Sequence, residues 1–394
     1  MQKRFVILVL LLSFVSTAIT AQNRSVEFDH SGFKEILAKA KKENKMIYID
    51  CYTAWCGPCK WMAKNVFTND TVADFYNKNF INTKIDMEKG EGIELAKKYQ
   101  IRAYPTMLFL NSDGVQLHRT CGSTSVKNFI SIGENALSPN TQLATYAANF
   151  NNGNVSSAAA ATYFSMLENA CQSFNPELEK YFSAQKESEL VSANNWKLFY
   201  NYVNYDSLKW FRYFEANKST FSKLYTNDSV DYKINQVYAG SLYFASKNKD
   251  KKEYETTKAR FRKLETKDGE KTLQYADLNL YEHEQDWANF AKTACEYIPK
   301  YAEKNVYELN RAAWDFYEHI DDMALLTKAE NWAKQAVEID DSYAINDTYA
   351  AVLYKSGKKT EAKAAAKKAI DLAKKTGEDS KETEALLTKI NAMK

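Results

Sequence analysis

Hydrophobic and polar positions follow two different rhythms along this chain. From Val26 to about Leu137, short apolar runs typical of buried strands alternate with stretches whose apolar residues recur every three or four positions, as in helices. From residue 140 onward only the helical rhythm remains. The 394 residues include just twelve Gly and five Pro, which leaves little room for turn-rich sheets. The pattern predicts an α/β domain over residues 22–139, followed by an all-helical region over residues 140–394.

The first region is expected to alternate between strands and helices. The expected strands cover residues 46–52, 81–87, 105–110 and 115–120. The expected helices cover residues 31–45, with Ser31 as N-cap, and residues 60–66, 71–79, 92–100 and 124–137. This alternation is typical of a sheet with helices on its faces, and the short turn at residues 111–114 predicts an antiparallel final pair of strands.

The end of the chain contains an approximate internal repeat. The segment AENWAKQAVEID aligns with EAKAAAKKAIDL so that Ala329 corresponds to Ala362, and AAWDFY aligns upstream with AAVLYK so that Ala312 corresponds to Ala350. A period of about 34 residues with alanines where paired helices meet resembles the tetratricopeptide repeat. The resemblance covers about residues 309–394 and implies stacked helix pairs that present a surface for protein–protein contacts.

Residues 190–225 are dense in aromatic side chains at helical spacing. We interpret them as the packed interior of a helical array, with a ligand groove as the alternative.

Residues 1–21 have the layout of a secretory signal. Lys3 and Arg4 precede an apolar run over residues 5–12, and small residues follow as far as Ala21. The run is shorter than the ~20 apolar residues of a membrane span. We therefore expect a cleaved signal and an exported, periplasmic protein. Removal of the signal lowers the formal net charge of the chain from +3 to +1. Because the basic residues are not clustered, we expect no nucleic-acid partner.

Cys56-Gly57-Pro58-Cys59 directly follows a predicted strand and opens a predicted helix. Free backbone N–H groups and the helix dipole at such a start stabilise an anion, so a thiolate on Cys56 is favoured. A metal site would need two further ligands, and neither a histidine nor a second CxxC motif lies beside this one, so we predict no metal and no other cofactor. A structural disulfide across so short a loop would add little stability. The spacing therefore favours a redox-active pair.

The segment WCGPCK, residues 55–60, resembles the active-site motif of thioredoxins. The order of elements over residues 26–137 is similar to the whole thioredoxin fold, and the domain also resembles secreted thioredoxin-like domains of bacterial envelopes, including the C-terminal domain of the thiol–disulfide interchange protein. The resemblance implies a central mixed sheet flanked by helices. It also implies that Cys56, the more exposed cysteine, attacks a substrate disulfide and that Cys59 resolves the mixed disulfide.

The resemblance assigns roles to residues around the pair. Asp50 would be a buried acid that takes the proton of Cys59, the alternative being a solvated acid. A cis peptide before Pro105 would present the backbone to an extended substrate. The implied substrate-binding residues are Trp55, Tyr104, Pro105, Thr106 and Gly122. Thioredoxins often place a lysine near the buried acid. Here the aligned position carries Asn82, with Lys84 two residues later, which leaves the proton path open.

The other cysteines carry no clear motif. We interpret Cys51 as a small buried core residue. Cys121 lies in a turn that borders the substrate groove of thioredoxins, and we interpret it as inert. Cys171 and Cys295, in helical segments, could be free thiols or form a bridge.

These observations predict an exported thiol–disulfide oxidoreductase that reduces disulfides in envelope proteins. Its partners would be disulfide-bearing protein substrates and a membrane-bound electron donor, because the sequence carries no nucleotide-binding signature. Two alternatives remain open. One is a disulfide oxidase or isomerase for protein folding, and the other is a non-enzymatic scaffold in which the thioredoxin-like domain only binds.

Overall fold

The computed structural model describes residues 24–153 and 155–394, so the predicted signal at residues 1–21 lies outside the described residues. The chain divides into two compact units, and the boundary between them along the sequence falls between Lys186 and Glu187. The predicted domain boundary at residue 139 falls within the first unit and stays a prediction.

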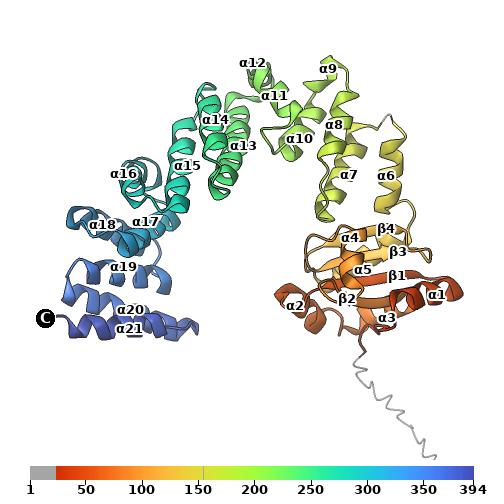
Figure 1. Ribbon diagram of the computed structural model, residues 1–394, viewed down its shortest axis with the longest axis horizontal. Coiled ribbons are helices and arrows are strands. Elements are labelled where there is room, and N and C mark those ends of the chain that lie inside the picture. The colour runs from red at the N-terminus through yellow and green to blue at the C-terminus, as the bar shows by residue number, and fades with distance from the viewer. Residues whose placement is uncertain (1–23, 154) are drawn as a thin grey trace, which may run out of the picture. The chain divides into compact units, whose positions relative to one another are not determined.

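A four-stranded mixed sheet with the order β2-β1-β3-β4 forms the centre of the first unit (Figure 1). Its strands are β1 (Met46–Tyr52), β2 (Phe80–Asp86), β3 (Thr106–Leu110) and β4 (Gln116–Cys121). β1 pairs parallel with β2 and antiparallel with β3, and β3 pairs antiparallel with β4. The prediction of an antiparallel final pair is therefore confirmed.

Five helices cover the two faces of this sheet. They are α1 (Phe33–Glu43), α2 (Gly57–Asn65), α3 (Asp70–Asn79), α4 (Gly92–Lys98) and α5 (Val126–Leu137). Alternation along β1 divides the core: Tyr48 packs with α2, α3 and α5, whereas Ile47 and Ile49 pack with α1 and α4. A mixed sheet between helices is the arrangement that the thioredoxin resemblance implied, and the predicted fold class is confirmed.

The start of α1 differs from the expected one. The N-cap residue is Gly32, which makes no side-chain cap, so the prediction of Ser31 as N-cap is wrong. The hydroxyl and the backbone N–H of Ser31 instead both donate to the carboxylate of Asp29, at 2.6 and 3.0 Å. Because Asp29 already accepts both donors of Ser31 within the turn, Ser31 does not cap the helix. The helix begins one residue later than expected.

Three further helices belong to the first unit: α6 (Leu143–Asn151), α7 (Ser157–Asn169) and α8 (Asn175–Ser183). α6 and α7 both contact β4. The backbone N–H of Leu143, at the start of α6, donates to Nδ1 of His118 at 3.2 Å. Burial lowers the pKa of His118 to about 4, so the ring is neutral at pH 7 and free to accept this bond.

A disulfide also joins the helices to the sheet. Cys121 at the end of β4 is bonded to Cys171, which follows α7. Our interpretation of Cys121 as inert is therefore wrong. Fifty positions separate the two cysteines in sequence, and it is the packing of α7 against β4 that brings them together. Cys51 is a free, fully buried core cysteine as predicted, and Cys295 is also free.

The second unit, described in full over residues 187–394, contains helices and no strand. Its first eight α-helices are α9 (Glu187–Leu190), α10 (Ala193–Tyr202), α11 (Lys209–Ala216), α12 (Lys218–Tyr225), α13 (Asn227–Lys247), α14 (Lys251–Arg262), α15 (Gly269–Glu284) and α16 (Trp287–Tyr297). After a π-helical turn (Ile298–Ala302) come α17 (Val306–His319), α18 (Met323–Ile339), α19 (Tyr343–Lys355), α20 (Lys359–Thr376) and α21 (Lys381–Ala392). None of the helices in the described part of the chain is long and apolar enough to cross a membrane.

The aromatic-rich segment lies inside the helical unit. Trp196 on α10 is buried, and its ring lies 5.5 Å from that of Phe214 on α11 and 5.1 Å from that of Tyr225 on α12. Phe211 and Phe221 are also buried. The interpretation of this segment as a packed interior is confirmed.

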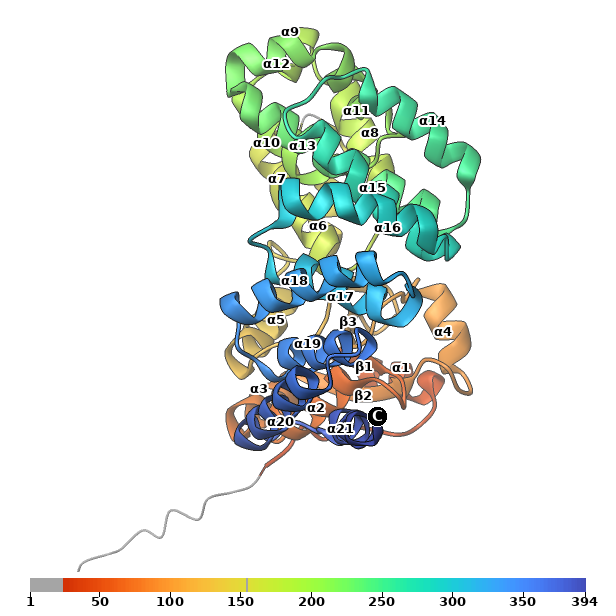
Figure 2. The same ribbon diagram turned by 90° about the vertical axis from the view of Figure 1, so that its left-hand side faces the viewer.

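The last five helices pack one against the next in sequence order (Figure 2). The alanines that define the repeat, Ala312, Ala329, Ala350 and Ala362, are all buried. Small side chains allow neighbouring helices to approach closely, so the repeat pattern marks helix–helix contacts. The tetratricopeptide assignment of residues 309–394 is consistent with these helices and stays a prediction.

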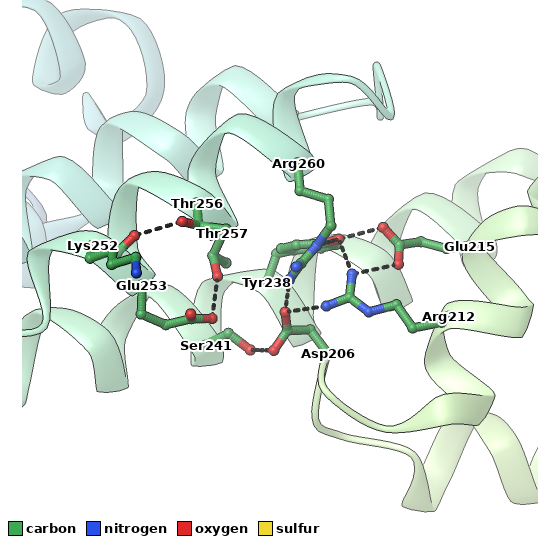
Figure 3. A network of polar contacts seen from close by, with 10 residues as sticks. All are labelled: Asp206, Arg212, Glu215, Tyr238, Ser241, Lys252, Glu253, Thr256, Thr257 and Arg260. Carbon is green, nitrogen blue, oxygen red and sulfur yellow. Dashed lines mark hydrogen bonds and ion pairs between the residues drawn. The ribbon is translucent and has the colours of Figure 1, made fainter.

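A polar network joins the loop before α11 to α11, α13 and α14 (Figure 3). The buried carboxylate of Asp206 accepts bonds from Arg212 at 3.2 Å, from Ser241 at 2.8 Å, and from Arg260. Arg260 also donates to the hydroxyl of Tyr238 at 2.8 Å. Asp206 is thus shared by two guanidinium groups from different helices, and Arg212 also pairs with Glu215 at 3.0 Å.

We expect Asp206→Ala to loosen this part of the helical unit. Removal of the carboxylate leaves two partly buried arginines without their shared acceptor, which should lower the local free energy of unfolding by about 2–3 kcal/mol. Hydrogen exchange in α11, α13 and α14, read by mass spectrometry, measures this change. The control is Asp228→Ala, which removes an exposed acid paired with exposed Lys267. Equal exchange in the two variants would contradict the assigned role of Asp206.

We expect the double variant Cys121→Ser/Cys171→Ser to weaken the attachment of α7 to β4. A cross-link between residues 50 positions apart removes chain entropy from the unfolded state, worth up to about 4 kcal/mol. Faster hydrogen exchange in α7 and β4 would report the loss. Cys295→Ser, which removes a free thiol, is the control. Exchange that matches the control would show that packing alone holds α7.

Candidate active site

The cysteine pair lies at the start of α2, directly after the loop that follows β1. Cys56 is the N-cap of α2, and its Sγ accepts the backbone N–H of Cys59 at 3.1 Å. Pro58 occupies the first turn, where a missing N–H costs no helical bond. Cys56 and Cys59 form a disulfide with their Cα atoms 5.3 Å apart. The sulfur of Cys56 therefore lies where the helix dipole and an N–H donor stabilise a thiolate.

Both cysteines are buried in this disulfide form. Cys56 is 2% exposed and Cys59 is 6% exposed. The expectation that Cys56 is the more exposed of the two is therefore wrong for this state. What distinguishes them is the position of Cys56 at the positive end of the helix, which supports its assignment as the attacking residue.

Asp50 lies on β1 and is 5% exposed, so the alternative of a solvated acid is wrong. Its Oδ1 has no hydrogen-bond partner among the residues that the structure describes. Burial raises the pKa of Asp50 to about 7, and the nearby charge of Lys84 opposes the rise. At neutral pH this carboxyl can therefore accept or release a proton.

A cavity of about 370 Å³ brings the acid and the second cysteine together. Asp50, Cys59 and Lys84 all line it, with Phe28 and Tyr52 beside them. Lys84 is the direct partner of Asp50 in the parallel pairing of β1 with β2, so the lysine two residues after the aligned position lies beside the acid. Asn82 is buried two residues earlier, partnered with Tyr48. Asp50 and Cys59 therefore face one shared cavity.

The peptide bond between Tyr104 and Pro105 is cis, as the resemblance implied. Thr106, the next residue, is fully buried and pairs with Cys51 on β1 and Cys121 on β4. Pro105 therefore lies near the end of β1 that leads into the cysteine loop. Its carbonyl accepts the backbone N–H of Gly122 at 2.8 Å.

Trp55 forms an exposed aromatic surface before the pair. Its ring is 66% exposed and meets the ring of Tyr104 edge to face, with centroids 6.0 Å apart. Its Nε1 donates to the carboxylate of Glu88 at 3.0 Å. Trp55 and Tyr104 are thus in contact, and the hydrogen bond to Glu88 orients the indole ring while leaving it exposed. Their role in substrate binding stays a prediction.

Sequence reasoning missed two groups at this site. Glu88 had no motif to mark it, because only the fold brings it to Trp55. The loop of residues 123–125 lines a hollow together with Gly57, Pro58 and Trp61. Its position directly after Gly122, a predicted substrate-binding residue, was the feature of the sequence that could have identified it. Among the described residues, no group of three or more His, Cys, Asp or Glu side chains could hold a metal ion.

This geometry supports dithiol–disulfide exchange. It supplies a sulfur at a helix N-terminus, a second sulfur within bonding distance, and an acid that titrates near neutral pH beside that second sulfur.

Comparisons with known proteins agree with this chemistry. The Thioredoxin family model matches residues 24–132. The chain is 38% identical to Thioredoxin-1 of Drosophila melanogaster over 71 residues, which is 18% of this chain and 62% of that protein. It is 30% identical to Thioredoxin-1 of Caenorhabditis elegans over 100 residues, 24% of this chain and 77% of that protein. The match thus spans less than two thirds of the Drosophila relative.

One solved structure is also similar in sequence. A candidate disulphide-isomerase of Bacteroides thetaiotaomicron is 44% identical, with 30% of this chain and 97% of that chain covered and a TM-score of 0.28.

We expect Asp50→Asn to stabilise the oxidised protein above pH 7. The folded-state pKa of Asp50 is about 7 and its ordinary value is 3.8, so the free energy of unfolding falls as pH rises between these values. The uncharged amide does not suffer this loss. The variant should therefore have a free energy of unfolding up to about 4 kcal/mol higher than that of the wild type at pH 8, and an equal one below pH 4. Urea unfolding at pH 8 and pH 3.5, read by pulsed hydrogen exchange in β1 and β3, tests this.

Asp113→Asn is the matched control, since Asp113 is exposed and paired with exposed Lys41. The same gain at both pH values would argue against an ionised, buried Asp50 as the cause.

Proposed function

Because this chain belongs to the thioredoxin family through residues 24–132, we propose that it is an exported protein-disulfide reductase that acts on proteins of the bacterial envelope. The observation that carries the redox assignment is the Cys56–Cys59 disulfide at the N-terminus of α2, with Asp50 buried beside Cys59.

The proposed reaction moves two electrons to the substrate. The thiolate of Cys56 attacks one sulfur of a substrate disulfide, which forms a mixed disulfide and releases the other substrate sulfur as a thiolate. Asp50 takes the proton of Cys59, whose thiolate then attacks Sγ of Cys56. The substrate leaves as a dithiol, and the Cys56–Cys59 disulfide must be reduced by an external dithiol before the next cycle.

The substrate would meet the exposed edge of this site. Trp55 and Tyr104 provide an aromatic surface, and the backbone around Pro105, Thr106 and Gly122 offers groups for pairing with an extended chain. Trp55 and Lys60 contribute shape and charge rather than bond making.

Export and partners rest on the sequence. The layout of residues 1–21 supports secretion to the periplasm. A reductase outside the cytoplasm needs reducing equivalents from across the membrane, so we propose a membrane-bound electron donor. The helices of residues 309–394, tetratricopeptide-like in their repeat, would supply a protein-binding surface.

The reduction potential of the Cys56–Cys59 pair separates reductase from oxidase. We expect a value near that of thioredoxin, about −270 mV, rather than the value of about −120 mV of a strong oxidant. Equilibration of the full mature chain in thiol buffers, with the two disulfides resolved by mass spectrometry, measures it. The variant Cys56→Ser/Cys59→Ser identifies the signal of the Cys121–Cys171 pair.

A potential near −120 mV, on the same scale, would overturn the reductase assignment in favour of disulfide formation or isomerisation. A pair that never exchanges with the buffer would leave the domain as a binding module in a scaffold.

A further inference from the structure

A groove in the first unit runs between α5 and α7 with β4 as its floor. Asn128, Ser131 and Asn135 form one wall, and their spacing of three and four residues places them on one face of α5. Thr162 and Asn169, seven residues apart, share one face of α7 and form the other wall. The groove holds a volume of about 540 Å³, within the range of ligand-binding sites.

The groove shares a loop with a hollow on the helix that carries the cysteine pair. Ser123 and Thr124 line its end, and the same two residues line a second hollow of about 440 Å³ that also contacts Gly57, Pro58 and Trp61. The loop of residues 123–124 therefore lies between the first turn of α2 and the groove, and a polypeptide joined to Cys56 would reach the groove along it.

Arg119 is the one charged residue among the described residues that line the groove. Its walls present hydroxyls and amides, with Ile132 and Met166 as apolar patches. His118 on the floor is neutral at pH 7, because burial lowers its pKa to about 4. Arg119 also borders the groove, but its guanidinium donates to the carbonyl of Tyr99 at 2.8 Å, in the core on the opposite face of the sheet.

The outer wall is an addition to the thioredoxin-like domain. α7 begins at Ser157, beyond the family match that ends at residue 132. The Cys121–Cys171 disulfide ties the end of α7 to the end of β4. The loop of residues 122–125 follows directly after Cys121. The chain thus holds this second wall covalently at the side of its active site.

We propose that the groove between α5 and α7 is a substrate subsite that binds an uncharged, polar stretch of polypeptide next to the cysteine under attack. This inference rests on the proposed disulfide exchange and names a feature of its substrate. Hydroxyls and amides on both walls can pair with the backbone and with Ser, Thr, Asn or Gln side chains. The wall residues are exposed and carry no charge, so a charged flank would find no opposite charge there, whereas an uncharged polar flank would find hydrogen-bond partners.

The test compares substrates with and without a flanking chain. Three peptides carry the same mixed disulfide to a chromophoric thiol and differ only in flanks of Ser/Asn/Gln, of Glu or of Lys; a small disulfide without peptide is the fourth substrate. For the full mature chain we expect kcat/KM to be about tenfold higher for the uncharged peptide than for either charged one.

Variants that fill the groove should abolish this preference. We expect Ser131→Trp and Thr162→Trp each to lower kcat/KM for the uncharged peptide about tenfold and to leave the small disulfide unchanged. The matched controls are Lys127→Trp on α5 and Glu168→Trp on α7, exposed residues that do not line the groove. The two variants change different helices, so a folding defect in one leaves the other informative.

Equal kcat/KM for the three peptides, or a preference that survives both Trp variants, would overturn the subsite. A wild-type chain that turns over the small disulfide but shows no flank preference keeps the proposed function and loses only this inference. A chain that turns over none of the four substrates overturns both.

Discussion

The hydrogen bond from the backbone N–H of Cys59 to Sγ of Cys56 sets the start of α2, and the chemistry of the protein depends on it. It places one sulfur at the positive end of a helix, where negative charge is stabilised, and keeps the second sulfur one turn later on the same helix. The strand before the loop carries the acid, and the register of β1 with β3 brings the backbone after the cis bond at Pro105 near this point. The sheet thus holds these groups close to one another.

Burial gives two residues of this unit opposite properties. Asp50 and His118 are both 5% exposed. Burial disfavours the charged form of each, so the pKa of the acid rises to about 7 and that of the histidine falls to about 4. Asp50 can therefore exchange a proton beside Cys59, whereas His118 stays neutral and serves only to hold the start of α6.

The helices after the sheet change what the domain presents to a substrate. α6 and α7 pack on β4, the edge strand of the sheet, and so protect an edge that would otherwise be free to pair. The same packing turns a flank of the active site into a two-walled groove. The helical unit beyond residue 187 is held by different means, with aromatic packing around Trp196, a charged network around Asp206 and close contacts between alanines.

The sequence alone predicted the strands and helices between residues 26 and 137 and the identity of the cysteine pair. Strand alternation and the helix after the CxxC motif follow from local patterns, so β1 and α2 could be predicted, whereas the cis bond before Pro105 was predicted only through the thioredoxin resemblance. Asp50 was predicted as a buried acid only through the thioredoxin resemblance, while its partnership with Lys84 required the register between two strands. The bond between Cys121 and Cys171, the contact of Glu88 with Trp55 and the groove between α5 and α7 join segments far apart in the chain. No local pattern encodes such contacts, because they arise only when helices and strands pack together.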